Sequence, residues 1–415
     1  MGTVGVGVRS TQGVRNRYLA EQLVLGFGQL GFHQGESASL GMIEGVTNEI
    51  EGLGLGHSLK DFQESLKALT ADPSDVALRQ VVLEEGRELS YMFRHTRSEI
   101  EQGMNATFED VKDMTKKVNT LAKLIADLNA KIRLKQGLDT ESEAMISERN
   151  GLVQEIGQLI QVTPITQDNG SVSLYTAGGR MLVEDKFANE LKVGPPGGAP
   201  NYAIKVQITS INGPLLDPIK SYGGHLGGAL QAYDEVLVTS LNRVDEIAFE
   251  FMNAFNAQHQ AGFALDGTTG NDFFAPPGGV AGAAANMALD PIVNDQPERI
   301  AAAANAADLP GGNTNLFDLA NIIDAPGILP DGTSPTEAWD GIVALVTHRI
   351  QSAELGITTE HASVSQLKNL HSSETAVNLD EELIAMAQAK TAFDAASRVI
   401  RAADEMALAV LQMVR

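Results

Sequence analysis

The segment from Leu265 to Asp272 carries the side chains best suited to holding a metal ion. It reads Leu-Asp-Gly-Thr-Thr-Gly-Asn-Asp, and its carboxylate, hydroxyl and amide oxygens could surround calcium, which prefers oxygen ligands. However, it lacks the bidentate glutamate that closes an EF-hand loop. The alternative is a plain turn at Asp266-Gly267, because Asp-Gly pairs favour turns. We expect the turn, and with it neither a metal site nor a cofactor.

Other residues that could perform catalysis form no recognisable pattern. The eight histidines are scattered, and no pair has the H-E-x-x-H spacing or another zinc-ligand spacing. There is neither a Walker loop nor a G-x-S-x-G elbow, and the absence of cysteine excludes thiol nucleophiles and disulfides. Adjacent carboxylates such as Glu84-Glu85 suit a solvated helix face. We therefore predict that the protein is not an enzyme.

The composition restricts the partners. The chain has 30 Lys and Arg against 53 Asp and Glu, and the resulting formal net charge of −23 disfavours nucleic acid and anionic lipid. No apolar run approaches the roughly 20 residues of a transmembrane helix. The N-terminal residues show no basic region followed by an apolar one, so export would need a route without a cleaved signal peptide. We predict no nucleic-acid partner and no membrane insertion.

Long helices are the elements that must position any functional surface. A seven-residue apolar repeat runs from Met104 to Ile132, with further apolar residues three positions beyond each repeat. Such a seam predicts a long helix packed on other helices. A second amphipathic helix is predicted over residues 147–162, after a break at Gly137-Leu138-Asp139. Helical periodicity returns near Leu226 and again around Ala338.

A β unit interrupts the helical pattern after Pro164. Apolar residues alternate with polar ones around Val172 and Leu174, and again from Tyr202 to Ile208, as in half-buried strands. Asn169-Gly170 marks a turn.

The predicted fold is mainly α with a small β insert. It is an elongated multi-helix rod built from both chain ends, with an inserted antiparallel β domain and a long C-terminal coiled-coil-type helix. We place the discontinuous rod domain at residues 1–162 and 221–377, with an irregular region rich in Gly, Pro and Asn at 262–335. The inserted domain is placed at 163–220 and the C-terminal assembly helix at 378–415.

The C-terminal helix has a clear start and an uninterrupted apolar pattern. Asn378 is a suitable N-cap, and Glu381 stands where a capping box requires a glutamate. An ordinary core helix and one half of a coiled coil both fit the periodicity, but so great a length without a break favours the coiled coil. The predicted assembly interface consists of Leu379, Leu383, Met386, Phe393, Ala396, Ile400, Ala403, Val410 and Val414.

Several stretches together resemble a known family. The residues from Ala376 to Glu382, with Ala392-Phe393, Arg398-Val399-Ile400 and Ala403-Asp404-Glu405-Met406, are similar to the C-terminal signature of flagellar axial proteins. The segment from Phe255 to Gly267, followed by Asp272-Phe273-Phe274, resembles the flagellar hook-associated protein 1 family. Further similarity to this family lies at 69–75, 79–83, 223–228 and 310–315.

This resemblance implies a structural protein of the bacterial flagellum, a junction adaptor between hook and filament. It implies export through the flagellar type III apparatus and an extracellular location. The implied partners are other copies of the chain in a ring, hook protein, a second hook-associated junction protein and an export chaperone. The terminal helices would form the inner part of the assembly.

The chain departs from the family pattern at both ends. Ala376 replaces a usual glycine, and Ala389 and Lys390 replace an aromatic residue and a glutamine. The family's N-terminal helix is not recognisable. This would follow if Met1-Gly2 is an artificial start of the sequence, or if the gene is a divergent short form. We therefore expect the C-terminal helix to be frayed or packed non-natively beyond about Phe393, or to be completed by a helix of another subunit.

An alternative function is a flagellar-type cell-surface module that binds polysaccharide or a host surface. The β insert between Pro164 and Pro218 would be its site, with Tyr175 and Tyr202 as stacking candidates.

Overall fold

The computed structural model describes the chain except for residues 1–3, 48–53, 136–139, 210–221, 376–378 and 414–415. The chain divides into two compact units. The larger spans Leu23–Val364, and the smaller combines Met1–Gln22 with Ser365–Arg415. Helices α1 (Val4–Gly41) and α10 (Pro335–Thr375) each contribute residues to both units.

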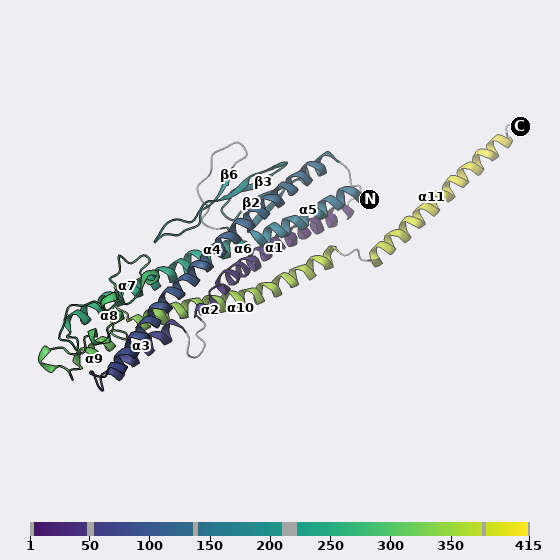
Figure 1. The fold of residues 1–415 in the computed structure, drawn as a ribbon. Helices are drawn as coiled ribbons and strands as arrows, with labels where there is room; N and C mark the ends of the chain where they lie inside the picture. Colours follow the sequence, from purple (N-terminus) through teal and green to yellow (C-terminus); the bar gives the residue numbers. More distant parts are fainter. Residues whose placement is uncertain (1–3, 48–53, 136–139, 210–221, 376–378, 414–415) are drawn as a thin grey trace. The chain divides into compact units, whose positions relative to one another are not determined.

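Helix α4 (Val76–Leu134) is the principal element of the larger unit (Figure 1). The Asp75 side chain caps its start by accepting from the amides of Ala77 at 2.7 Å and Leu78 at 3.3 Å. At 1.5 Å per residue its 59 residues span about 89 Å. Every residue of the predicted repeat is buried, which confirms the predicted helix: Met104, Val111, Val118, Ile125 and Ile132.

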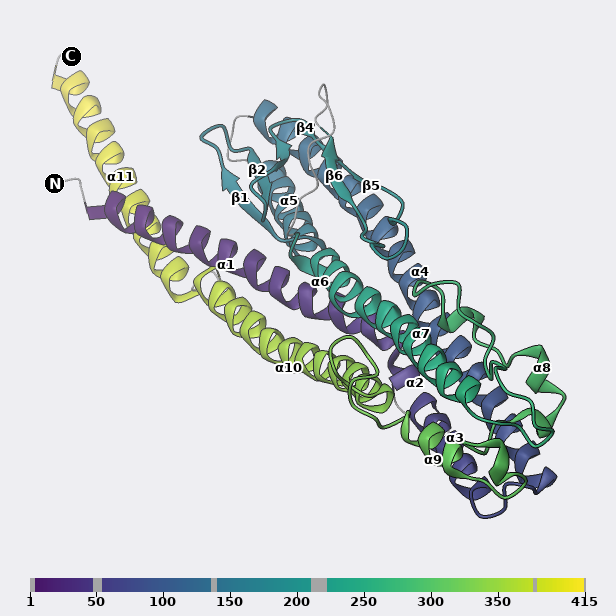
Figure 2. The ribbon, with the colours of Figure 1, turned by 90° about the vertical axis from the view of Figure 1, so that its left-hand side faces the viewer.

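Other helices surround α4. They are α2 (Glu44–Thr47), α3 (Leu55–Leu69), α5 (Thr140–Leu159), α6 (Gly224–Ala232) and α7 (Val238–Ala261), with the π-helical turn η1 (Tyr233–Leu237) between the last two. Helices α3, α5, α6 and α7 all contact α4, and Figure 2 shows α7 running alongside it. The predicted second amphipathic helix is therefore present, but it ends at Leu159 because the chain enters a strand at Val162.

In the described part of the β insert, six short strands lie beside α4. Strands β1 (Val162–Thr166), β2 (Val172–Thr176), β3 (Met181–Glu184) and β4 (Phe187–Ala188) make an antiparallel sheet in that order. Strands β5 (Glu190–Val193) and β6 (Val206–Thr209) form a separate antiparallel pair. The strand predicted from Tyr202 begins only at Val206. Its partner strand gives way to Gly194-Pro195-Pro196, and prolines lack the N–H that a ladder needs.

The region from residue 262 to 335 consists mainly of loops and short helical turns. It holds the short helices α8 (Pro291–Asn294) and α9 (Thr314–Asn321) and the 3-10 turns η2 (Ala284–Asn286), η3 (Pro297–Arg299) and η4 (Ala306–Asp308). The next helix, α10, starts with a capping box that the sequence analysis missed. The Ser334 hydroxyl accepts from Glu337 N at 3.1 Å, and the Glu337 carboxylate accepts from Ser334 N at 3.0 Å.

An aromatic cluster fastens the irregular region to the helices. Phe62 of α3 lies 5.4 Å from Phe255 of α7, and 5.6 and 6.0 Å from Phe273 and Phe274, measured between ring centroids. These rings are buried, and their tilted or edge-to-face arrangements are favourable for aromatic pairs. The fold is thus mainly α with a small antiparallel insert and long helices towards both chain ends, which confirms the predicted class.

Candidate functional site

Helix α11 (Leu379–Met413) carries the predicted assembly residues. Its 35 residues correspond to about 53 Å. It is continuous to Met413, so it does not fray beyond Phe393 in this structure. Non-native packing and completion by a helix of another subunit, the other two alternatives, stay predictions. Asn378, the predicted N-cap, lies outside the described residues.

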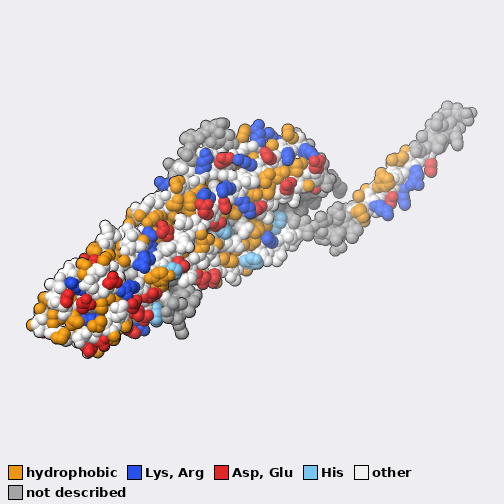
Figure 3. All heavy atoms as spheres, in the orientation of Figure 1, with side chains coloured by type: hydrophobic (Ala, Val, Ile, Leu, Met, Phe, Trp, Pro, Cys, Tyr) orange, Lys and Arg blue, Asp and Glu red, His pale blue; other side chains and the backbone are white. Residues whose placement is uncertain are grey.

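The apolar side chains of α11 face solvent. Met386 is 64% exposed, Phe393 72% and Ile400 62%, and the small residues Ala396 and Ala403 are exposed as well. The space-filling view shows hydrophobic side chains along this helix together with Lys and Arg (Figure 3). The side chains of Leu379, Leu383 and Val410, and all of Val414, lie outside the described part of the chain. Five of the nine predicted interface residues are therefore available to a partner.

The structure adds two residues that sequence reasoning missed. Val399 and Met406 are 69% and 65% exposed, and each directly precedes a position of the seven-residue repeat. On a helix, residues three or four apart are neighbours, so Val399 lies beside Ala396 and Ala403, and Met406 lies beside Ala403. The two side chains therefore widen the apolar face. The signal for them was present in the sequence as a second apolar repeat one residue before the first.

The candidate calcium loop is a turn. The Asp266 carboxylate accepts from Thr268 N at 2.9 Å and from Thr268 Oγ1 at 2.6 Å, and it pairs with Arg299 Nε at 3.2 Å. The hydrogen bond from Thr268 holds the pKa of Asp266 below its usual value. Gly267 has φ +82°, a conformation that favours glycine in such a turn. A guanidinium thus supplies the positive charge near this carboxylate.

The histidines do not form a metal centre. Within the described residues no group of three or more His, Asp or Glu side chains has the geometry to hold a metal ion. His259 is the most buried histidine that the structure describes, at 1% exposure, and burial lowers its pKa to about 4. Its two ring nitrogens are bonded to backbone groups of the irregular region.

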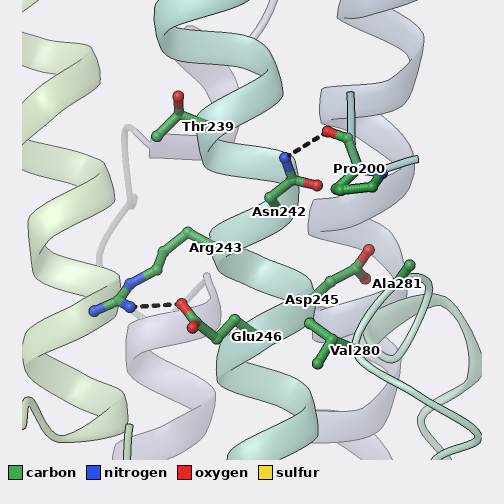
Figure 4. A pocket seen from close by; sticks show the side chains of 8 residues that line it. All are labelled: Pro200, Thr239, Asn242, Arg243, Asp245, Glu246, Val280 and Ala281. Atoms are coloured by element: carbon green, nitrogen blue, oxygen red, sulfur yellow. Dashed lines mark hydrogen bonds and ion pairs between the residues drawn. The ribbon is translucent and has the colours of Figure 1, made fainter. Parts of the chain in front are cut away.

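A groove beside α7 is a further candidate for a binding site (Figure 4). It encloses about 530 Å³ and is lined by polar residues of α7 and by Pro200, Val280 and Ala281. The Asn242 amide donates to Pro200 O at 3.0 Å, and Arg243 pairs with Glu246 at 2.6 Å. The buried Asp245 carboxylate lies 3.0 Å from Arg97 Nε and also accepts from the amides of Gly282 and Ala284. The charged side chains of the lining are thus all paired.

Of the two tyrosines of the β insert, Tyr175 lies in the four-stranded sheet and Tyr202 lies outside both sheets. Tyr175 is half-buried on β2, opposite Thr163 and Met181. Tyr202 precedes β6 and packs on the hydrophobic core. The structure therefore does not present them as one stacking surface on one sheet.

Family models match two separate stretches of the chain. Residues 40–274 match the model described as the flagellar hook-associated protein FlgK helical domain. Residues 371–413, which contain the whole of α11, match the flagellar basal body rod FlgEFG protein C-terminal model. Within the described residues, no helix is long and apolar enough to cross a membrane.

Similar proteins carry related names. Flagellar hook-associated protein 1 of Bacillus subtilis (strain 168) is 26% identical over 447 residues, which cover 98% of this chain and 85% of the relative. The Escherichia coli (strain K12) protein of the same name is 29% identical over 224 residues, covering 53% of this chain and 41% of the relative. That second match thus spans less than half of the relative.

A solved structure shares the fold. The flagellar hook junction protein FlgK from Burkholderia pseudomallei superposes with a TM-score of 0.73 at 13% identity, covering 86% of this chain and 100% of that chain. At this identity the likeness supports the fold alone. The match to the helical-domain model, however, extends over more than half of the sequence. The chain is therefore a structural component of the bacterial flagellum and belongs to the flagellar hook-associated protein FlgK family.

Proposed function

We propose that this protein is a junction adaptor between hook and filament that self-assembles through its terminal helices. The observation that supports this most directly is the exposed apolar face of α11, formed by Met386, Phe393, Val399, Ile400 and Met406. The residues that carry it match the flagellar basal body rod FlgEFG protein C-terminal model. The names of the similar proteins, hook-associated protein 1 and hook junction protein, point in the same direction.

Burial of this face would drive the assembly. A Phe, Ile or Met side chain contributes roughly 1.5–3 kcal/mol when it passes from water into a fully buried position. Ala396 and Ala403 lie within the same face, and their small side chains allow a partner helix to approach closely. Repetition of such contacts around a ring would make assembly cooperative, although each contact is weak.

The proposed partners follow from this role. They are other copies of the chain in a ring, hook protein and a second hook-associated junction protein, with an export chaperone before assembly. The proposed location is the extracellular hook–filament junction, reached by flagellar type III export without a cleaved signal peptide. The seam residues Leu379, Leu383, Val410 and Val414 belong to the same proposed interface.

The double substitution Phe393→Asp and Ile400→Asp tests the proposal. It places two carboxylates in the apolar face, and burying an unpaired charge is strongly unfavourable. In cells whose only copy of the gene carries both changes, we expect swimming in soft agar to be lost and filaments to be absent by electron microscopy. The protein itself should still be exported into the medium.

A matched variant introduces the same charges on the opposite face. Ala387→Asp with Thr391→Asp alters two exposed positions of the same helix, one and five residues after Met386, which lie on the side away from the apolar face. These cells should swim and carry filaments. Normal filaments on cells with Phe393→Asp and Ile400→Asp would show that α11 does not assemble through this face. An equal loss of filaments with both double variants would show the same.

A further inference from the structure

His259 connects the end of α7 to the irregular region that follows. Its Nδ1 lies 2.8 Å from the carbonyl oxygen of Asn271, and its Nε2 lies 3.0 Å from the backbone nitrogen of Ala301. A backbone N–H can only donate, so Nε2 must be unprotonated and accept. Nδ1 therefore carries the proton and donates to Asn271. The two contacts require the neutral imidazole in one tautomer.

The segment around Ala301, which His259 contacts, also accepts hydrogen bonds from side chains of two other helices. Arg79 of α4 donates from Nη1 to the carbonyl oxygens of Ile300 at 2.8 Å and Pro297 at 3.2 Å. Asn315 of α9 donates to Ala301 O at 2.7 Å. A short bridge then joins Ala303 to Phe263. The residues 297–303 are thus held by buried polar bonds from α4, α7 and α9.

Burial favours the neutral form of the imidazole, whereas the charges around it act in both directions. Arg79 is fully buried, and burial lowers its pKa to about 10. Burial is also the main cause that lowers the pKa of His259 to about 4, and the charge of Arg79 adds to it. Asp272 and the Asn271 carbonyl act in the opposite direction. The Asp272 carboxylate is engaged by Gln260 Nε2 at 2.5 Å, and Arg299 pairs with Asp266.

We propose that His259 is an acid-sensitive latch that holds residues 297–303 against α7 and releases them when its ring is protonated. A proton on Nε2 would set one N–H against the Ala301 N–H at a separation of 3.0 Å. It would also create a second buried cation close to Arg79. Local release relieves both, because it hydrates the ring and frees the Ala301 amide. Release would also uncover Phe273, whose ring lies edge-on to His259 at 5.5 Å.

Hydrogen exchange of the whole protein tests the latch. An open-state pKa of 6.5 and a closed-state pKa of about 4 predict that opening of the amides of residues 299–303 is about 30-fold more frequent at pH 5 than at pH 8, after correction for intrinsic rates. The fluorescence of Trp339, 1% exposed on α10, should be unchanged at pH 5 if the release is local. A simultaneous change of Trp339 would mean general unfolding and would overturn the proposal.

Two variants separate the latch from ordinary acid sensitivity. Glutamine cannot be protonated in this range, so in His259→Gln the opening of the same amides should change by less than about threefold between the two pH values. The control His361→Gln removes an exposed histidine of α10 and should behave as the unsubstituted protein. An equal response in His259→Gln, or no response in the unsubstituted protein, would contradict the latch.

A direct measurement covers the case in which His259→Gln does not fold. In protein labelled with nitrogen-15 at histidine, the His259 ring should show an unprotonated Nε2 and a protonated Nδ1 at pH 7. The opposite tautomer, or a charged ring at that pH, would refute the arrangement on which the latch depends.

Discussion

Single buried side chains organise the irregular region. The side chain of Asn256 on α7 is buried, with 5% exposure, and makes three hydrogen bonds to backbone groups. Its Oδ1 accepts from the amides of Phe273 at 3.0 Å and Phe274 at 2.9 Å, and its Nδ2 donates to Phe274 O at 2.8 Å. This fixes the two phenylalanines that complete the aromatic cluster. An amide side chain is suited to the position because it both donates and accepts.

Asn256→Ala is expected to lower the free energy of unfolding by about 2–4 kcal/mol, because it leaves two amides and one carbonyl buried without partners. Urea unfolding followed by the fluorescence of the single tryptophan measures this. Asn253→Ala is the matched control, since Asn253 is exposed one turn earlier on the same helix, and it should change stability by less than about 0.5 kcal/mol. Similar losses for both would argue against the role of the three bonds.

At the scale of elements, glycines allow three helices to touch through their backbones. A Cβ at Gly31 of α1 would lie 2.0 Å from Gln158 O of α5, and one at Gly35 would lie 2.1 Å from His225 O of α6. From the opposite side, a Cβ at Gly228 of α6 would lie 1.8 Å from Phe32 O. Each of these separations is far below van der Waals contact. Helix α1 can therefore keep this close approach only with glycine at these positions.

Gly35→Ala is expected to destabilise the protein by about 1–3 kcal/mol, because the backbones of α1 and α6 must separate. The direction of the change in stability is informative. Alanine is the better helix former, so without the close approach Gly35→Ala would stabilise the protein by up to about 1 kcal/mol. Gly151→Ala on α5 provides the contrast, because no atom lies within 4 Å of its added Cβ. Thermal unfolding should show a lower Tm for the first variant and an equal or higher one for the second. A higher Tm for Gly35→Ala would refute the close approach.

At the scale of the whole molecule, buried charges join segments that are far apart in the sequence. Glu36 of α1, whose side chain is 5% exposed, pairs with Arg349 Nε of α10 at 3.1 Å. Arg349 also pairs with Glu235 of η1 at 2.8 Å, and His33 lies 3.9 Å from Glu36. Burial raises the pKa of Glu36, while Arg349 and His33 oppose this shift. Removal of Arg349 would leave a buried carboxylate with little compensation.

A double-mutant cycle with Glu36→Gln and Arg349→Gln should show this dependence. We expect the double variant to be less destabilised than the sum of the single variants, with a coupling of about 1–3 kcal/mol measured by urea unfolding. Glu235→Gln is the reference for the more exposed half of the network and should lower stability by less than about 1 kcal/mol. Additive effects of the first two substitutions would show that the pair is not coupled.

The sequence by itself determined the local structure and the family resemblance. The repeat from Met104 to Ile132 is a property of one helix, and a seven-residue period is sufficient to recognise it. Turn residues and alternation located the β insert in the same way. The apolar residues Met386, Phe393 and Ile400 of α11, which the structure shows exposed, were also predictable, whereas Val399 and Met406 were missed. The FlgK family match confirms what the resemblance implied about the class of protein.

The tertiary structure alone decided which surfaces meet. Neither the Phe273-Phe274 pair nor Phe62 indicates in the sequence that their rings lie within 6.0 Å of each other. The need for glycine at position 35 depends on the backbone of His225, and the tautomer of His259 depends on an amide 42 residues away. Periodicity describes the faces of single elements, because it arises from the geometry of one helix or strand. Contacts between distant residues arise only when those elements pack, so they had to be read from the folded chain.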